Sequence, residues 1–308
     1  MILCLTLNPA IDRTLLIPNF SLGNVHRAQD IIVAAGGKGL NVARTIRILG
    51  GEPLCMGFVG GHSGRLLADL AQKEGLYSSW TWTDSETRTC TILITQSGDA
   101  TVINEPGMPV SIADWKRLQE DVQEQLPLVN FISVSGSLPL NSSTQDLSEL
   151  LSSLVDSGKQ VWVDTSGMAL KTALAYPQLC IKVNGNELGE LLGLEINDLA
   201  SAERALLLLG GRGRPASVIT LGSAGALLAT KDMTWHAQGP SVDIVSTVGS
   251  GDAFLAGLVS ALDAAKDWPE ALCDAVAAGT ANALSAGGGQ FGLETFWEIR
   301  EQIKVQTL

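Results

Sequence analysis

Short apolar runs alternate along the chain with longer segments in which apolar residues recur every three or four positions. The short runs predict buried strands, and the periodic segments predict amphipathic helices. Because helices separate most of the strands, the pattern indicates right-handed βαβ units and a mostly parallel sheet covered on both faces. The predicted strands are 2–7, 54–59, 129–134, 160–164, 178–183, 216–221 and 225–230. The predicted helices lie near 39–49, 63–74, 111–125, 143–157, 184–192, 199–209, 251–265, 269–285 and 293–303.

Two places break this alternation, because strand patterns there follow each other without a helix between them. Residues 11–17 are predicted to pair with 28–33. Residues 88–96 are predicted to pair with 100–105 through a turn at Ser97-Gly98-Asp99. These four strands would form a small sheet that stands beside the main one.

The expected organisation is a single α/β domain over residues 1–308, with a β lid contributed by about 11–33 and 87–106. The length and the 45% of hydrophobic residues are sufficient for a large buried core. The net charge of −12 argues against nucleic acid or an anionic membrane as a partner, because both require a basic face. An anionic small-molecule substrate would therefore need a local basic pocket.

The five cysteines are scattered, lie mostly among apolar residues and form no CxxC pair. This usage is typical of reduced thiols in a cytoplasmic protein, so we expect neither disulfides nor structural zinc. The first residues lack the basic segment of a signal peptide. Every apolar run is shorter than the roughly 18 residues that a membrane span needs. We therefore expect a cytoplasmic protein.

The segment Gly249-Ser250-Gly251-Asp252 delivers an aspartate to the start of an apolar helix. Its glycines allow backbone N–H groups to converge, and the positive end of the helix adds to the same place, so the turn predicts an anion site. A carboxylate inside an anion site suits a general base that acts on a hydroxyl as the hydroxyl attacks a phosphoryl group. The alternative is that Asp252 only caps the helix.

A second glycine-rich segment, Gly36-Gly37-Lys38-Gly39, precedes Asn41 at the start of another predicted helix. It lacks the GxxxxGK spacing and the following Ser or Thr of a phosphate-binding P-loop. Three glycines permit close approach of the backbone to a polar ligand, while Lys38 supplies charge and Asn41 an amide. A solvated glycine turn before a helix is the alternative interpretation.

Asp12 follows the first predicted strand through Asn8-Pro9. Ligands of α/β sheets bind at the carboxyl edge of the strands, and a carboxylate there can bind neighbouring sugar hydroxyls. Asp12 could equally be an ordinary turn residue.

Together these segments resemble the ribokinase-like, phosphofructokinase B family of carbohydrate kinases over nearly the whole chain. The opening motif and the Asn-Glu-Pro-Gly segment are most similar to the branch of 1-phosphofructokinases and tagatose-6-phosphate kinases. The matching segments, in order, are Thr6 to Asp12, Gly36 to Ala43, Thr87-Arg88, Asn104-Glu105-Pro106-Gly107, Ser135 to Pro139, Lys182-Val183-Asn184 with Glu187, Leu221 to Ala226, and Thr247 to Asp252.

The resemblance implies a three-layer ribokinase-like fold and a kinase that uses ATP and Mg²⁺. Asp252 would be the general base, and the amides of Gly249, Ser250, Gly251 and Asp252 would stabilise the transferring phosphoryl group. The residues implied to hold the sugar are Asp12, Gly37, Lys38, Asn41 and Ser137.

The candidates for neutralising a sugar phosphate are Lys38, Arg27 and Arg88, although each could also be a solvated surface charge. On the nucleotide side the resemblance implies Lys182, Asn184 and Glu187, with Glu187 organising Mg²⁺ through water. A looser set comprises Thr220, Gly222 and Gly225 along the ribose and phosphates, and Asn282 beside adenine.

The expected activity is ATP-dependent phosphorylation of a phosphorylated ketohexose, with D-fructose 1-phosphate giving fructose 1,6-bisphosphate as the first choice. Tagatose 6-phosphate and fructose 6-phosphate are alternative acceptors, and a non-catalytic sugar-phosphate or nucleotide sensor is the alternative of a different class. A dinucleotide-binding dehydrogenase is disfavoured, because no GxGxxG follows the first strand. Apolar residues on both faces of the lid predict a homodimer that forms through it.

Overall fold

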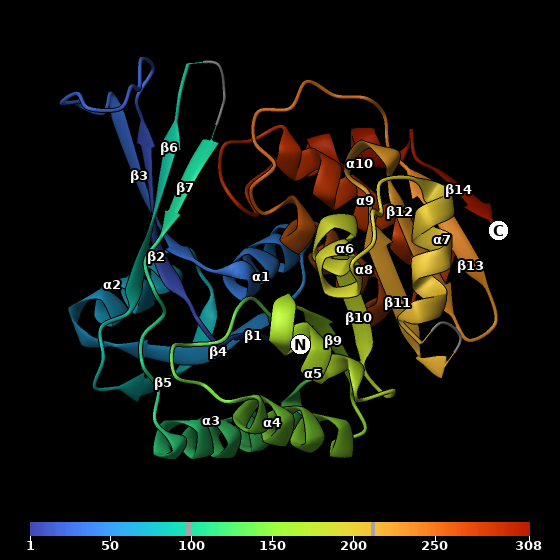
Figure 1. The fold of residues 1–308 in the computed structure, drawn as a ribbon, viewed down its shortest axis with the longest axis horizontal. Coiled ribbons are helices and arrows are strands. Elements are labelled where there is room, and N and C mark those ends of the chain that lie inside the picture. Colours follow the sequence, from blue (N-terminus) through green and yellow to red (C-terminus); the bar gives the residue numbers. More distant parts are fainter. Residues whose placement is uncertain (97–99, 211–212) are drawn as a thin grey trace.

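A large central sheet and a smaller separate sheet organise the computed structural model, which describes residues 1–96, 100–210 and 213–308 (Figure 1). The central sheet has ten strands in the order β14-β13-β12-β11-β10-β9-β8-β1-β4-β5. Their bounds are β1 Ile2–Thr6, β4 Pro53–Gly60, β5 Tyr77–Thr83, β8 Phe131–Ser135, β9 Gln160–Asp164, β10 Cys180–Asn184, β11 Ala216–Thr220, β12 Ala226–Thr230, β13 Thr234–Gln238 and β14 Lys304–Thr307.

Parallel pairing runs from β5 to β11, which confirms the predicted mostly parallel sheet. The remaining strands, β12, β13 and β14, pair antiparallel at one edge. The crossover connections place helices on both faces of the sheet, as the βαβ pattern requires. Within the described residues, no helix is long and apolar enough to cross a membrane.

The two helical layers pack on opposite faces of the central sheet (Figure 1). Alternate residues of β1 separate into two cores, so that Leu3 and Leu5 join one and Ile2 and Cys4 the other. The first layer contains α3 (Ile112–Gln125), α4 (Thr144–Asp156), α5 (Gly167–Leu174), α6 (Gly185–Leu192) and α7 (Leu199–Leu208). The second contains α1 (Lys38–Ile48), α2 (Gly61–Lys73), α8 (Ser250–Asp263) and α9 (Trp268–Ala283). Helix α10 (Leu293–Arg300) packs beside α9 through Phe296 and Ile299.

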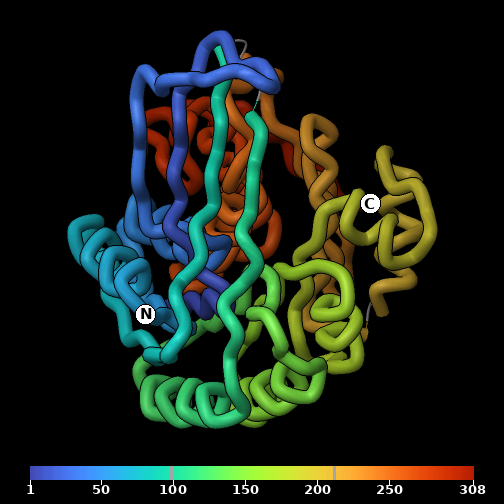
Figure 2. Tube along the Cα trace, turned by 60° about the vertical axis from the view of Figure 1, so that its left-hand side comes forward, coloured from blue at the N-terminus to red at the C-terminus, as the bar shows by residue number. Residues whose placement is uncertain are grey.

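The small sheet has the order β3-β2-β6-β7, and its strands rise side by side from the body of the molecule (Figure 2). Its strands are β2 (Ala10–Leu16), β3 (Asp30–Gly36), β6 (Arg88–Ile94) and β7 (Ala100–Asn104). Both predicted antiparallel pairs are present, β2 with β3 and β6 with β7, and a parallel β2–β6 pairing joins them. We call this sheet the lid. The predicted turn at Ser97-Gly98-Asp99 lies outside the described residues.

Four elements were absent from the sequence prediction, namely β5, β13, β14 and α5. Strand β5 is an edge strand of mixed Ser, Thr and aromatic residues, with only Thr81 and Thr83 buried, so it has no apolar run. Strand β14 is almost fully exposed at the opposite edge, and α5 has only eight residues. The helix predicted over 293–303 ends at Arg300, because the chain then turns into β14.

Candidate active site

Several of the predicted site residues lie where the carboxyl ends of β1, β9 and β10 meet the first turns of α1 and α8. They are Lys38 and Asn41 on α1, Lys182 on β10 and Asp252 on α8. Asp252 lies in the first turn of α8, is only 5% exposed and accepts a hydrogen bond from Asn41 Nδ2 at 2.8 Å. Burial raises the pKa of Asp252 to about 6, against the attraction of Lys38. Asp252 is thus an enclosed carboxylate at the positive end of a helix.

The backbone around Asp252 depends on glycines, because any other residue at these positions would displace neighbouring atoms. Gly249 caps α8 with a φ of 78°, and a Cβ there would lie 2.6 Å from the Cα of Gly288. A Cβ on Gly251 would lie 2.7 Å from Lys182 Nζ. The bare turn therefore brings the ammonium of Lys182 directly beside the first amides of α8.

A buried carboxylate, Asp164 at the end of β9, holds two lysines. Its Oδ2 accepts from Lys182 Nζ at 2.7 Å and its Oδ1 from Lys38 Nζ at 3.2 Å, while Asp164 is fully buried. Burial alone would raise the pKa of Asp164, but Lys182 and Lys38 outweigh it and hold the pKa below its usual range. Lys38 also contacts Glu187 Oε1 at 3.3 Å, so its ammonium lies on the side of the predicted nucleotide residues.

The predicted sugar residue Asp12 lies on β2 at the root of the lid, opposite Cys90 of β6. Partial burial raises the pKa of Asp12 to about 6, although Arg44 and Arg88 draw it down. A Cβ on Gly36 would lie 2.1 Å from the Asp12 carboxyl carbon, so the glycine leaves the space that this side chain occupies.

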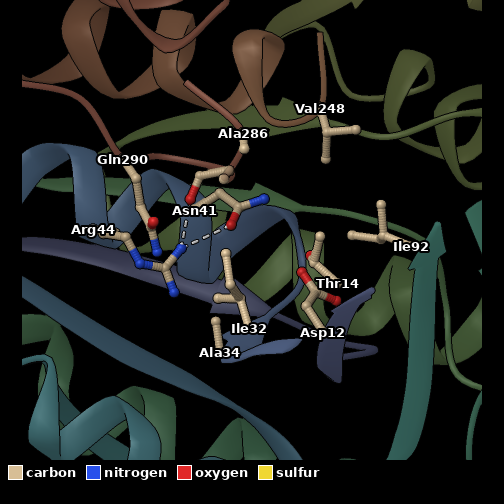
Figure 3. Close-up of a pocket in the computed structure, with 12 residues that line it drawn as sticks. Asp12, Thr14, Ile32, Ala34, Asn41, Arg44, Ile92, Val248, Ala286 and Gln290 are labelled. Atoms are coloured by element: carbon tan, nitrogen blue, oxygen red, sulfur yellow. Dashed lines mark hydrogen bonds between the residues drawn. The ribbon is translucent and has the colours of Figure 1, made fainter. Parts of the chain in front are cut away.

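Asp12 lines a cavity of about 30 Å³ between the lid and the body (Figure 3). The body contributes Asn41 and Arg44 from α1 and a segment from Ala286 to Gln290. The lid contributes Thr14, Ile32, Ala34 and Ile92. Apart from Asp12 and Thr14 the lid side of this cavity is apolar, and its volume is far below the roughly 300 Å³ or more of a small-molecule pocket.

Arg88 and Ser137 both contact Asn8, which connects the predicted sugar side to the end of β1. Arg88 Nη2 donates to the Asn8 carbonyl at 3.1 Å, and Asn8 Nδ2 donates to Ser137 Oγ at 3.0 Å. Arg88 Nε is buried and has no hydrogen-bond partner in the described part of the chain. A buried N–H without a partner is unfavourable, and an anion at the lid root could supply the missing acceptor.

The predicted nucleotide residues lie at the ends of adjacent strands. Asn184 and Thr220 are register partners on β10 and β11. The side chain of Asn184 accepts from the Glu187 amide at 2.8 Å, and Glu187 reaches back to the Asn184 amide, which forms a capping box at the start of α6. Gly222 and Gly225 follow with positive φ values in the β11–β12 turn.

Two predicted residues are placed elsewhere. Arg27 is exposed in the connection between β2 and β3, at the end of the lid away from Asp12, so one chain does not bring it together with Lys38 and Arg88. Asn282 is fully buried, and its amide donates to the Val248 carbonyl and accepts from the Gly289 amide. Both groups of its amide are thus used within the protein, where they tie Gly289 to the turn before α8.

Three parts of the site were not predicted from the sequence, namely Asp164, Arg44 and the glycines Gly287-Gly288-Gly289. Asp164 ends the apolar run Val161-Trp162-Val163, and an acidic residue at the carboxyl end of a buried strand is a usable signal. Arg44 follows Asn41 by three positions, which places both side chains on one helical face. The close contact of Gly288 with Asn41 depends on distant chain segments and has no local signal.

The model of the pfkB family carbohydrate kinases matches residues 5–295. The chain belongs to this family. The sequence resemblance is therefore confirmed, and so is the predicted ribokinase-like architecture. Asp252 and its turn, Asp12 and Asn41 accordingly lie in a carbohydrate kinase.

Phosphofructokinase-2 from Escherichia coli, solved with substrates and products, is 27% identical with a TM-score of 0.89 and covers 97% of this chain and 98% of its own. A Staphylococcus aureus protein provisionally named a phosphofructokinase is 28% identical with a TM-score of 0.82 and covers 100% of this chain and 99% of its own. A Thermotoga maritima protein provisionally named a 1-phosphofructokinase is 23% identical with a TM-score of 0.87 and covers 100% and 99%; it shows the shared fold alone.

The opposite pKa directions of Asp252 and Asp164 generate a stability prediction. Asp252→Asn is expected to raise the urea midpoint at pH 7.5, because it removes an ionised carboxylate whose burial is unfavourable. At pH 4.5 the gain should shrink, since the folded Asp252 has then taken up its proton. Asp164→Asn is expected to lower the midpoint at pH 7.5, because Lys38 and Lys182 lose their shared counter-ion. A lower midpoint for Asp252→Asn at pH 7.5 would contradict this account.

Proposed function

We propose that this carbohydrate kinase phosphorylates a phosphorylated ketohexose with ATP, and that D-fructose 1-phosphate is converted to fructose 1,6-bisphosphate. The observation that carries the proposal is the enclosed Asp252 carboxylate at the start of α8, beside Lys182 and Asn41. Such a carboxylate suits proton removal from a hydroxyl next to an anion site. The phosphofructokinase names of the structural neighbours support a sugar phosphate as the acceptor.

In the proposed reaction the acceptor hydroxyl loses its proton to Asp252 as its oxygen forms a bond to the γ-phosphorus, and the bond to the departing ADP oxygen breaks. Asn41 holds Asp252 Oδ2, so we assign the proton to Oδ1. The first amides of α8 and Lys182 would stabilise charge on the transferring group.

Mg²⁺ is typical of such kinases, and the residues present fit it. The part-exposed carboxylate of Glu187 is fixed by Asn184 at the start of α6. Because Mg²⁺ keeps several waters and takes few protein ligands, this single carboxylate is chemically sufficient beside nucleotide phosphates. When bound, the ion would neutralise phosphate charge.

The basic residues at the lid root support a phosphorylated acceptor. Arg88 has a free buried donor close to Asn8, and its charge lowers the pKa of Asp12. A sugar whose hydroxyls contact Asp12 could therefore present its phosphate to Arg88. Fructose 6-phosphate and tagatose 6-phosphate would satisfy the same two groups, and they remain the alternative acceptors.

The proposed substrate is tested by measuring ADP release with fructose 1-phosphate, fructose 6-phosphate, tagatose 6-phosphate, fructose and ribose. We expect the highest kcat/KM with fructose 1-phosphate.

The proposed general base is tested in the same assay. We expect kcat/KM to fall as the pH drops through about 6, and kcat to fall about a hundredfold in Asp252→Asn. The acid limb follows because protonated Asp252 cannot accept a proton. Asp232→Asn, an exposed change in the β12–β13 turn, is the matched control. Saturable binding of these ligands without turnover by the wild type would favour the sensor alternative.

The proposed phosphate site predicts a selective KM effect. Arg88→Ala should raise KM for the sugar phosphate far more than KM for ATP, because it removes a cation near Asp12 at the lid root. Lys38→Ala should raise both KM values, because the Lys38 ammonium contacts Asp164 and Glu187 on the nucleotide side. Arg27→Ala should have a smaller effect on KM for the sugar phosphate, since Arg27 lies at the far end of the lid. Exposed Lys116→Ala controls for a change in net charge. Equal effects of Arg88→Ala on both substrates would place the phosphate elsewhere.

We also propose that the protein is a homodimer formed through the lid. The outer lid strands β3 and β7 expose Ile31, Ile32, Val102 and Ile103, each at least 44% accessible. A four-stranded sheet with exposed apolar residues and two free edges gains stability when a second copy covers it. Phosphofructokinase-2 from Escherichia coli has a tetrameric inhibited form, so oligomers occur in a structural neighbour.

Light scattering at micromolar concentration should give twice the chain mass of 32.3 kDa. Ile103→Asp should shift the mass toward the monomer, because it places a charge in the apolar lid surface, whereas Leu207→Asp on exposed α7 should not. A fully active wild-type monomer would refute the lid dimer.

A further inference from the structure

Arg44 occupies a central position beneath the candidate site that the proposed reaction does not explain. It lies on α1 three residues after Asn41 and is only 8% exposed. Its guanidinium donates to Asn41 Oδ1 at 2.9 Å and to the Gly288 carbonyl at 2.8 Å (Figure 3). It also donates to the Ala35 carbonyl at 2.7 Å and to Glu74 Oε2 at 2.6 Å.

The contact with Asn41 determines the orientation of an amide. A guanidinium only donates hydrogen bonds, so it requires the oxygen end of the Asn41 side chain. The nitrogen end must then face Asp252, where it donates to Oδ2 at 2.8 Å. Without Arg44, the amide could rotate and present its oxygen to the carboxylate, which would replace a hydrogen bond by repulsion.

The other contacts fix Arg44 itself. Glu74, at the end of α2, supplies a counter-ion in a largely desolvated place. The Ala35 carbonyl belongs to lid strand β3, and Gly288 belongs to the segment that packs against Asn41 and Gly249. Four elements thus restrain one guanidinium, which leaves it a single orientation toward Asn41.

We propose that Arg44 is a positioning residue for Asp252 that acts through the amide of Asn41. Only the kinetic part of this inference rests on the proposed function, because the arrangement around Asp252 can be measured without substrate. A merely structural arginine would stabilise α1, the lid root and the Gly288 segment without influencing the proton affinity of Asp252.

The relevant measurement is the titration of Asp252 by carbon-13 NMR, assigned by its loss in Asp252→Asn. The charged groups that act on Asp252 are Lys38 on α1, Asp164 on β9 and Lys182 on β10, and these remain in place in every variant below. Arg44→Met removes the donor to Asn41 while it retains a long side chain. We expect the pKa of Asp252 to rise by about one unit, since a hydrogen bond to the charged form is lost.

Three further variants separate positioning from general damage. Arg44→Lys retains a cationic donor but not the planar guanidinium, so the pKa of Asp252 should rise measurably but by less than in Arg44→Met. Glu74→Gln retains an acceptor for Nε and should leave this pKa nearly unchanged. Arg47→Met removes the same charge from an exposed position one turn further along α1 and is the matched control.

In the kinase assay, Arg44→Met should lower kcat about tenfold or more, with KM for ATP within about twofold, and should move the acid limb of the pH profile upward. If no substrate is turned over by the wild type, the proposed function fails, while the NMR titration still decides the role of Arg44. If Arg44→Met does not fold, the comparison of Arg44→Lys with Glu74→Gln decides it: a larger pKa change in Arg44→Lys supports positioning. Two results would overturn the proposal. The first is a folded Arg44→Met in which Asp252 has the same pKa as in Arg47→Met. The second is the same Asp252 pKa in Arg44→Lys and Glu74→Gln.

Discussion

The rest of the site depends on the ion pairs that the buried carboxylate of Asp164 makes with Lys38 and Lys182. This carboxylate holds Lys38 and Lys182 from two different elements in a place where an unpaired ammonium would be strongly unfavourable. Through Lys38 it also influences Glu187 and Asp252, so three carboxylates and two ammonium groups form one cluster with a near-balanced charge. The two ammonium groups thereby keep this carboxylate cluster close to neutral inside a protein of net charge −12.

Close backbone approach is the second constraint. Gly249, Gly251 and Gly288 remove side chains where α8, α1 and the segment after α9 converge. Each added Cβ would meet another backbone or a site side chain within 3 Å, so these positions are determined by tertiary contact. Asn282 has its place in this arrangement, because it links the Val248 carbonyl to the Gly289 amide from a fully buried position.

Much of the fold and the site could be predicted from the sequence, for reasons visible in individual elements. Buried strands such as β1 and β9 have continuous apolar runs, and α8 begins at a recognisable glycine turn. Strands β5 and β14 could not be found in this way, because edge strands bury few residues and need no apolar pattern.

The candidate site shows the same division. Asp252, Lys38 and Asn41 belong to local motifs, and their positions were predictable from the segments that contain them. Gly288 belongs to the site through its contact with Arg44 across 244 positions of the chain, which no local pattern encodes, whereas Arg44 itself follows Asn41 by one helical turn. Asn282 illustrates the reverse case, because the sequence placed it on a predicted helix but did not show the direction of its side chain.

The lid also has a mechanical property that follows from where its strands enter the body. Asp12, Ala35 and Arg88 all lie near the attached end, whereas the β2–β3 connection is free at the other. Seven residues of β2, at about 3.3 Å each, give the lid a length of roughly 20 Å. A ligand held by Asp12 would act near the attached end. A rotation of the lid by a few degrees would displace the residues at that end little and the distant β2–β3 connection much more.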